Sequence, residues 1–506
     1  MKANSTKIIL FVSVILFIGA GLFFRLNMFS SYLIHVDSYK YLVQADSFQS
    51  DVSLNYAKQN LDIQSKWGLP LFIQAENSIF QFRGEDLVNL FRWNNIILSL
   101  LCALILFAFI KNKVKFFAIP LFLSPIFFDL SSYVVNEYLN LFLIITLFVS
   151  LQNVFNIKKI LNRSVLAILI GSILAFLPFV RPESIVFSLL VPVFLFVKDK
   201  KIFMISVISE FVIAGGLIGF ISLHLNKISI NYPSIFVIIL VLAEIIGLYF
   251  LLKSKVQLLR KLSIYTISLL LPALYFLSQT YKNAISQDAP LYFFIIILFA
   301  VVSYLLTNKG RKISNQTVLF SILLLSLITI FYFFNSGIDR YIITIFGMAI
   351  LTLILAFENM RFKIFLPRKY LYMGGVCIVL ILTAFSIIHI NVYRPREQDY
   401  QQYVVKSVNL DMSKRVYMSG FLYTPYLFYK NTITIIADNM KIQDISKNSY
   451  IIVEESLRIT NLGLFNDIIT SDQDFTLVRS YKSPYNFTYS GGESHEGKIY
   501  IYYRQN

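Results

Sequence analysis

Long apolar runs make up most of this chain, and basic residues separate them in a regular way. Runs of roughly 17–25 apolar residues, the length that crosses a lipid bilayer, alternate with short polar gaps. Nearly all lysines and arginines lie in every second gap, and the other gaps hold a few single charges. Basic residues concentrate on the cytoplasmic side of membrane proteins. The pattern therefore predicts a chain that crosses the cell membrane many times, and it assigns each gap to one side.

Composition agrees with this class. Hydrophobic residues make up 57 % of the 506 residues and charged residues only 14 %, which is more apolar surface than a soluble protein of this length can bury. The net charge of +17 comes from basic residues that flank apolar runs, so we predict no nucleic-acid partner. Cys102 and Cys377 lie inside apolar runs and are predicted to be core residues without a disulfide. The four histidines are not clustered, so no zinc site is predicted.

The apolar runs define the predicted spans, about thirteen in number. They form a membrane domain over residues 1–390, with a long first outer loop over residues 27–89 and a cytoplasmic N-terminus. The predicted spans are Ile8–Phe24, Leu90–Ile110, Phe116–Leu130, Tyr138–Phe155, Val165–Val180, Ser184–Val197, Ile202–Leu223, Ile235–Leu252, Leu262–Thr280, Leu291–Leu306, Val318–Phe334, Tyr341–Phe357 and Tyr370–Ile390.

Residues 391–506 differ from the rest, because they are polar and carry short runs rich in β-branched residues between Gly and Asn. Such runs are typical of strands, and the stretch Tyr400–Val408 could form a helix. We therefore predict a small α/β domain outside the cytoplasm. Its predicted strands are Arg415–Met418, Thr432–Ala437, Tyr450–Val453, Phe475–Val478 and Lys498–Tyr503.

The few charges in the other gaps all fall on the predicted outer side, which indicates a polar site built from the ends of several helices. Asp37 opens an amphipathic segment, where it is either a helix N-cap or a base that takes a proton from a hydroxyl group. Trp67 is either an interfacial anchor or part of the site. The outer charges are Asp37, Glu137, Arg181, Glu183, Asp339 and Arg340.

The order of these residues resembles the GT-C superfamily of membrane glycosyltransferases. Asp37 and Tyr39 follow the first span, and Asn136–Tyr138 opens an inward span, as in that group. The segment Phe179–Ser184 is similar to its "T-R-P-E-G" turn, and Asp339–Ile343 is similar to its "R-Y-L-L-P" start of a late span. Within the superfamily, the pattern is most similar to the protein O-mannosyltransferase-like family (glycosyltransferase family 39), which includes the lipid A aminoarabinose transferases.

The resemblance implies an all-α polytopic membrane fold of GT-C type with a small outer α/β domain. It implies a polyprenyl-phosphate-linked sugar as donor and a glycan, lipid or protein as acceptor, with inversion at the sugar. Ser38 and Ser184 depart from the family pattern, which leaves divalent-metal use open. The implied roles are general base for Asp37, donor-phosphate binding for Arg340, Arg181 and Tyr341, and substrate orientation for Glu137, Glu183, Tyr39 and Trp67.

Two other functions are compatible with the sequence. A polysaccharide polymerase or ligase is also a membrane sugar enzyme, but its large outer loop normally lies late in the chain. A transporter or flippase of lipid-linked sugars would use charges inside the membrane, and Glu210 and Glu244 lie within apolar runs, where an unpaired charge is costly.

The predicted alternation of sides can be tested by labelling single cysteines. Ser336 lies in a predicted outer gap and Ser254 in a predicted inner gap. A membrane-impermeant thiol reagent should label a cysteine at position 336 in intact cells, and should label one at position 254 only after the membrane is opened. The reverse pattern would overturn both the topology and the position of the site.

Overall fold

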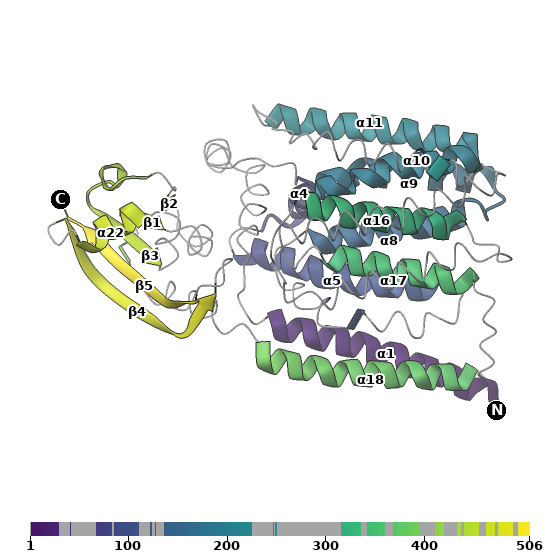
Figure 1. Cartoon of the computed structure of the whole chain (residues 1–506), viewed down its shortest axis with the longest axis horizontal. Helices are drawn as coiled ribbons and strands as arrows, with labels where there is room; N and C mark the ends of the chain where they lie inside the picture. Colours follow the sequence, from purple (N-terminus) through teal and green to yellow (C-terminus); the bar gives the residue numbers. More distant parts are fainter. Residues whose placement is uncertain are drawn as a thin grey trace.

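A computed structural model describes part of the chain, and the account below is confined to that part. The described residues are 2–29, 41, 67–82, 85–110, 122–123, 127, 136–224, 246, 248–249, 253, 315–334, 342–359, 368–393, 410–411, 413–418, 433–436, 440–454, 462–470, 474–488 and 494–505. They form a bundle of helices and, beyond one end of it, a sheet (Figure 1). The N-terminus lies at the other end of the bundle (Figure 1).

The long helices coincide with predicted spans, which confirms those spans as helical. The predicted spans 116–130, 235–252, 262–280 and 291–306 lie wholly or largely outside the described residues. The helices are α1 (Lys2–Phe29), α4 (Gly68–Phe80), α5 (Glu85–Phe109), α8 (Glu137–Val154), α9 (Ile160–Val180), α10 (Ile185–Lys198), α11 (Lys200–His224), α16 (Asn315–Phe334), α17 (Ile342–Asn359) and α18 (Arg368–Tyr393).

Within the described residues, four helical stretches are long and apolar enough to cross a membrane by length and composition. They are Asp86–Phe109, Glu137–Val154, Ile160–Val180 and Lys200–Ile221. Shorter apolar stretches are Val14–Leu26, Asn315–Leu324, Ile343–Thr352 and Met373–Ile388. These lengths agree with a polytopic membrane protein, since about 20 residues of helix span a bilayer.

Hydrogen bonds between helices show which helix ends share a face of the bundle. On one face, the Asn136 side chain at the start of α8 donates to the Val180 carbonyl at the end of α9. At the opposite face, Gln316 of α16 donates to the Leu151 carbonyl near the end of α8, 3.3 Å away. Thr317 of α16 donates there to the Leu355 carbonyl of α17. Neighbouring predicted spans should begin at alternate faces of the bundle, and this is confirmed for α8, α9, α16 and α17. Which face is the outer one stays a prediction.

The opposite face also carries an ion pair between Arg163 of α9 and Asp199, which are 2.6 Å apart. Asp199 ends α10 and caps α11, because its carboxylate accepts hydrogen bonds from the Lys201 and Ile202 backbone amides. Burial alone would raise the pKa of Asp199, but these hydrogen bonds and the Arg163 guanidinium outweigh it and hold the pKa below its usual value. A carboxylate at the start of a helix is favoured by the helix dipole.

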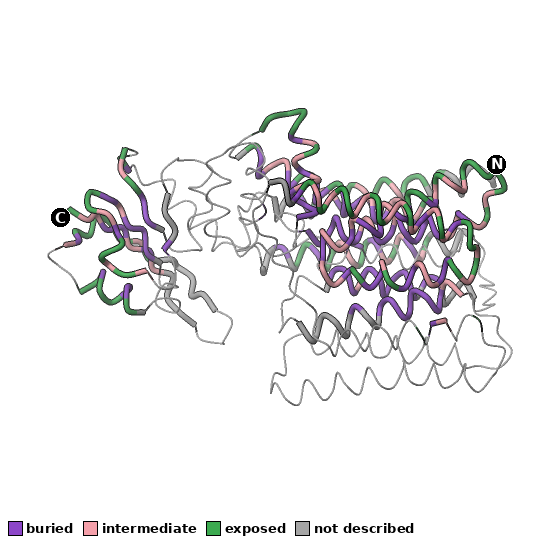
Figure 2. The backbone as a smooth tube through the Cα atoms, turned by 90° about the horizontal axis from the view of Figure 1, so that it is seen from above, coloured by how far each residue is buried: buried purple, intermediate pink, exposed green. Residues whose placement is uncertain are grey.

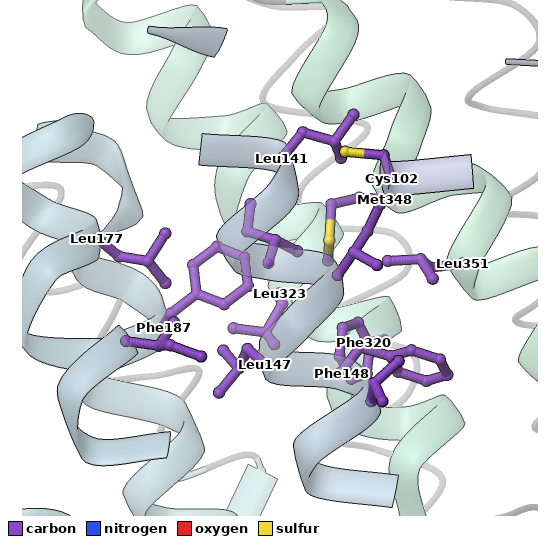
Figure 3. Packing of buried hydrophobic residues seen from close by; sticks show 14 of the residues in the cluster. Cys102, Leu141, Leu147, Phe148, Leu177, Phe187, Phe320, Leu323, Met348 and Leu351 are labelled. Atoms are coloured by element: carbon purple, nitrogen blue, oxygen red, sulfur yellow. The ribbon is translucent and has the colours of Figure 1, made fainter. Parts of the chain in front are cut away.

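The bundle core is built around α8, which packs against α5, α9 and α17. Most of its residues are buried, as expected for a central helix. Figure 3 shows the close packing of this core, where the Phe148 and Phe320 rings meet edge to face with centroids 5.0 Å apart. The labelled core residues are Cys102, Leu141, Leu147, Phe148, Leu177, Phe187, Phe320, Leu323, Met348 and Leu351.

The helices at the periphery of the bundle expose apolar side chains. Phe211 and Val212 of α11 are largely exposed, and buried residues concentrate in the middle of the bundle (Figure 2). Such surfaces are suited to lipid. Cys102 is buried as predicted, but the prediction for Cys377 is wrong, because this residue is exposed on α18. An apolar helix at the rim of a bundle turns one face away from the core.

The C-terminal residues form a five-stranded sheet with the order β2-β1-β3-β5-β4. Strand β1 pairs in parallel with β2 and β3, and β5 pairs antiparallel with β3 and β4. The helix α22 (Leu462–Thr470) packs on one face through Leu464 and Ile468. Each predicted strand is confirmed, whereas the predicted helix Tyr400–Val408 lies outside the described residues. The strands are β1 (Arg415–Met418), β2 (Ile433–Ile435), β3 (Ser449–Glu454), β4 (Phe475–Thr488) and β5 (Ser494–Arg504).

The contact between α9 and α11 depends on Gly171. A Cβ atom at this position would overlap the Ser206 carbonyl oxygen and lie 2.8 Å from the Ser209 Cβ. We predict that Gly171→Ala lowers the free energy of unfolding by about 1–3 kcal/mol, the usual cost of overpacking. Gly215→Ala on α11 is the matched control, because a Cβ there meets nothing within 4 Å. Denaturant unfolding in detergent measures both, and equal stabilities would contradict the packing described.

Candidate functional site

The helix α4 brings the first predicted outer loop onto the end of α9. Its first residue, Gly68, packs so closely on Val180 that a Cβ would lie 2.7 Å from the Val180 backbone nitrogen. Glycine is the residue that permits this approach. Trp67 is only 3 % exposed and packs with Phe179 and Ile221. The ring therefore helps to join α4 to the ends of α9 and α11, and both predicted roles of Trp67 stay predictions.

Three of the predicted site residues meet beside this contact. The Arg181 guanidinium forms an ion pair with the Glu137 carboxylate, and both side chains are fully buried. A second carboxylate, Glu183, lies 3.5 Å from Arg181 Nη1 and is 18 % exposed. Arg181 follows α9, Glu137 begins α8, and Glu183 lies in the 3₁₀ turn η3 (Pro182–Ser184). Helix ends that are distant in sequence thus form one charged cluster.

A neutral network continues this cluster to α17. The Asn140 amide accepts a hydrogen bond from Ser184 Oγ at 2.9 Å and donates one to Thr344 Oγ1 at 3.3 Å. All three side chains are buried, so the two hydrogen bonds satisfy polar groups that water does not reach. Sequence reasoning missed Asn140 and Thr344. The signal for Asn140 was its helical spacing from Asn136 and Glu137, which places polar groups on neighbouring positions of one span.

These contacts place the beginnings of three helices at one face of the bundle. The helix α8 begins at Glu137, α10 begins one residue after Ser184, and α17 begins two residues before Thr344. The first backbone N–H groups of a helix have no partner within the helix, and its dipole makes this end positive. The positive ends of these helices therefore lie near the charged cluster, where the Glu137 carboxylate occupies the first turn of α8.

Four predicted site residues lie outside the described part of the chain: Asp37, Tyr39, Arg340 and Tyr341. The structure does describe residues that lie close to them in the sequence. Tyr41 is 2 % exposed and belongs to the same hydrophobic core as Leu69 of α4 and Phe91 of α5. Arg340 and Tyr341 directly precede α17. The predicted roles of the four residues stay predictions.

Arg25 is a buried cation that the sequence did not assign to the bundle. It lies within α1, where its Nε donates to Ser99 Oγ at 2.5 Å and its Nη1 donates to the Gly21 carbonyl at 3.1 Å. Its Nη2 reaches the carbonyls of Phe122 and Phe127, and Tyr138 of α8 donates to the same Phe127 carbonyl. Arg25 therefore links α1 to the start of α8 through neutral acceptors.

Among the described residues, no three His, Cys, Asp or Glu side chains come together as a metal site would require. The carboxylates of the charged cluster face Arg181 instead. The chemistry that this part of the site supports is binding and orientation of an anionic or polar substrate.

Comparison of the sequence with protein-family models and with curated proteins finds no match. The overall fold does have counterparts among solved structures, in agreement with the fold class that the sequence resemblance implied. It is similar to two crystal structures of ArnT from Cupriavidus metallidurans, one bound to undecaprenyl phosphate and one in the apo state. Each match has a TM-score of 0.56 at 8 % sequence identity and covers 99 % of this chain and 98 % of the ArnT chain.

The buried ion pair should dominate the stability of this region. We predict that Glu137→Gln lowers the free energy of unfolding by about 3–5 kcal/mol, because it leaves a buried guanidinium charge without its carboxylate. The matched change Glu183→Gln should cost much less, since Glu183 is partly exposed and Arg181 keeps Glu137. Denaturant unfolding in detergent compares the two variants. A larger loss for Glu183→Gln would contradict this ranking.

Proposed function

We propose that this protein is an integral-membrane glycosyltransferase that moves a sugar from a polyprenyl-phosphate donor to an acceptor hydroxyl group at the outer face of the membrane. The observation that carries the proposal is the GT-C-type fold, which extends over 99 % of the chain. The polar cluster at the predicted outer face supports it. One of the similar ArnT structures is bound to undecaprenyl phosphate, and we transfer this class of lipid to the donor of this chain.

The converging helix starts of α8, α10 and α17 suit a substrate with a phosphate group. Arg340 and Tyr341 directly precede α17, so we assign them to the donor phosphate. Arginine can hold phosphate oxygens with two parallel hydrogen bonds. Arg181 is the second cation of the site, but Glu137 neutralises much of its charge. We therefore assign the larger share of phosphate binding to Arg340.

In the proposed reaction, Asp37 accepts the proton of the acceptor hydroxyl group. The acceptor oxygen attacks the anomeric carbon from the side opposite the phosphate, and a new glycosidic bond forms with inversion. The bond between the anomeric carbon and the phosphate oxygen breaks, and its electron pair leaves with the polyprenyl phosphate. A general base in such a step typically contributes about 10²–10⁴-fold to the rate.

The remaining predicted residues orient the substrates. Glu183 is the partly exposed carboxylate of the cluster, so it is the one available to acceptor hydroxyl groups. Glu137 holds Arg181 in place, and Trp67 acts by fixing α4 on the end of α9. Tyr39 contributes from the first outer loop. The acceptor class, whether glycan, lipid or protein, stays open.

The transporter hypothesis gains no support from Glu210. A transporter is expected to carry its intramembrane charges along a central path. Glu210 instead lies on α11, whose apolar stretch is mostly exposed. Glu244 lies outside the described residues.

The proposed role of Asp37 as general base can be tested by the variant Asp37→Asn in a transfer assay with radiolabelled polyprenyl-phosphate sugars. We predict a loss of about 10²–10⁴-fold in turnover, with unchanged expression and membrane insertion. Asp411→Asn is the control, because Asp411 is an exposed carboxylate near β1 that accepts hydrogen bonds from Ser413. Retained turnover in Asp37→Asn would remove Asp37 as the base.

The phosphate assignment can be tested by Arg340→Ala. A hydrogen bond to a charged group is worth about 1.5–3 kcal/mol, so the donor KM should rise by roughly tenfold or more while the acceptor KM changes little. The control Lys253→Ala removes an exposed cation that bonds Tyr249. If only the acceptor KM changed, Arg340 would not be a phosphate ligand.

A further inference from the structure

The helix α4 ends in a turn that presents apolar side chains instead of burying them. Ile79, Phe80 and Phe82 expose 76 %, 56 % and 36 % of their surfaces. The rings of Phe80 and Phe82 stack with centroids 5.3 Å apart and planes 9° from parallel. The opposite side of α4 is buried against the bundle, from Gly68 to Asn77. We call Ile79, Phe80 and Phe82 the apolar knuckle.

A buried amide holds the knuckle in a defined shape. Asn77 is 1 % exposed; its Nδ2 donates to the Phe82 carbonyl at 2.9 Å, and its Oδ1 accepts from the Phe82 backbone N–H at 2.6 Å. Gln81 between them is left-handed, with φ of 54°, and its backbone N–H donates to the Asn77 carbonyl. Such a turn is a regular way to end a helix. Here it fixes two stacked rings on the outside of the protein.

The helix that follows the knuckle also exposes apolar side chains. The helix α5 begins three residues after Phe82, and its exposed residues Trp93 and Ile97 lie one turn apart on one side. With 25 residues, α5 is about 37 Å long, whereas the hydrocarbon core is about 30 Å thick. α5 is therefore long enough for its first turn, which begins at Glu85, to lie in the headgroup region.

Contacts with two helices of the bundle hold α4 in place. α4 starts on the end of α9 at Gly68, beside the charged cluster, and Asn94 of α5 donates to Glu76 near the other end of α4. Figure 1 shows α4 at the end of the bundle that is nearer the sheet. α4 is thus held at its start by the end of α9 and near its end by α5.

We propose that the apolar knuckle inserts into the outer leaflet of the bilayer, at the boundary between headgroups and acyl chains. A short helix with one buried side, polar residues such as Glu76 and Ser78, and an apolar tip is suited to that boundary. The exposed apolar residues of α5, the helix that follows the knuckle in the chain, are expected to face lipid. Insertion would anchor α4, and with it Trp67 and the end of α9, at a fixed depth relative to the lipid phosphates.

The insertion can be measured by fluorescence quenching in lipid nanodiscs that contain spin-labelled lipids. A single cysteine at Phe80, in a chain whose Cys102 and Cys377 are replaced by alanine, would carry an environment-sensitive fluorophore. Ile381, exposed on α18, is the control for the membrane interior, and Val478, exposed on β4, is the apolar control outside the membrane. The probe at Phe80 should lose fluorescence to a spin label near the headgroups more than to one deep in the acyl chains.

Other outcomes would contradict the proposal. If the probe at Phe80 behaved like the probe at Val478, with quenching by aqueous iodide and not by lipid, the knuckle would lie in water. If nanodiscs that hold one molecule gave no lipid quenching and those that hold two showed contact between the probes, a second copy would cover the knuckle. This measurement does not depend on catalysis, so it is independent of the proposed glycosyltransferase function.

Discussion

The arrangement of the outer helix ends depends on the buried ion pair between Arg181 and Glu137. A charge inside an apolar bundle is tolerated only with a partner, so this contact sets the end of α9 against the start of α8. The turn that follows Arg181 then places Ser184 on Asn140, and Asn140 on Thr344 of α17. One electrostatic requirement thus brings three helix starts to the same face, and their dipoles support the phosphate binding that we propose there.

Much of the fold follows from local features of the sequence. The period and length of the apolar runs predicted the helices, and β-branched runs predicted each strand of the sheet, because both signals depend on residues close in sequence. The charge alternation correctly grouped Glu137, Arg181 and Glu183 on one face. β4 and β5 extend beyond the predicted strands, since they pair with each other over most of their length and pairing is a non-local effect.

The sequence could not show which helices become neighbours. The ion pairing of Arg181, the burial of Trp67 and the role of Arg25 all depend on packing between segments far apart in the chain. Cys377 was wrongly predicted as a core residue because an apolar run has the same composition whether it faces protein or lipid. Asp37 and Arg340 lie outside the described residues, so their roles rest on the resemblance to the GT-C superfamily.

The central claim is that this protein transfers sugar from a lipid-linked donor. The most direct measurement uses the purified wild-type protein in liposomes with a panel of radiolabelled polyprenyl-phosphate sugars and follows both the sugar and the released lipid. The account predicts that at least one donor is consumed and that free polyprenyl phosphate appears in step with transferred sugar. No consumption of any donor by folded, correctly oriented protein, together with movement of intact donor across the bilayer, would contradict the claim and indicate a transporter.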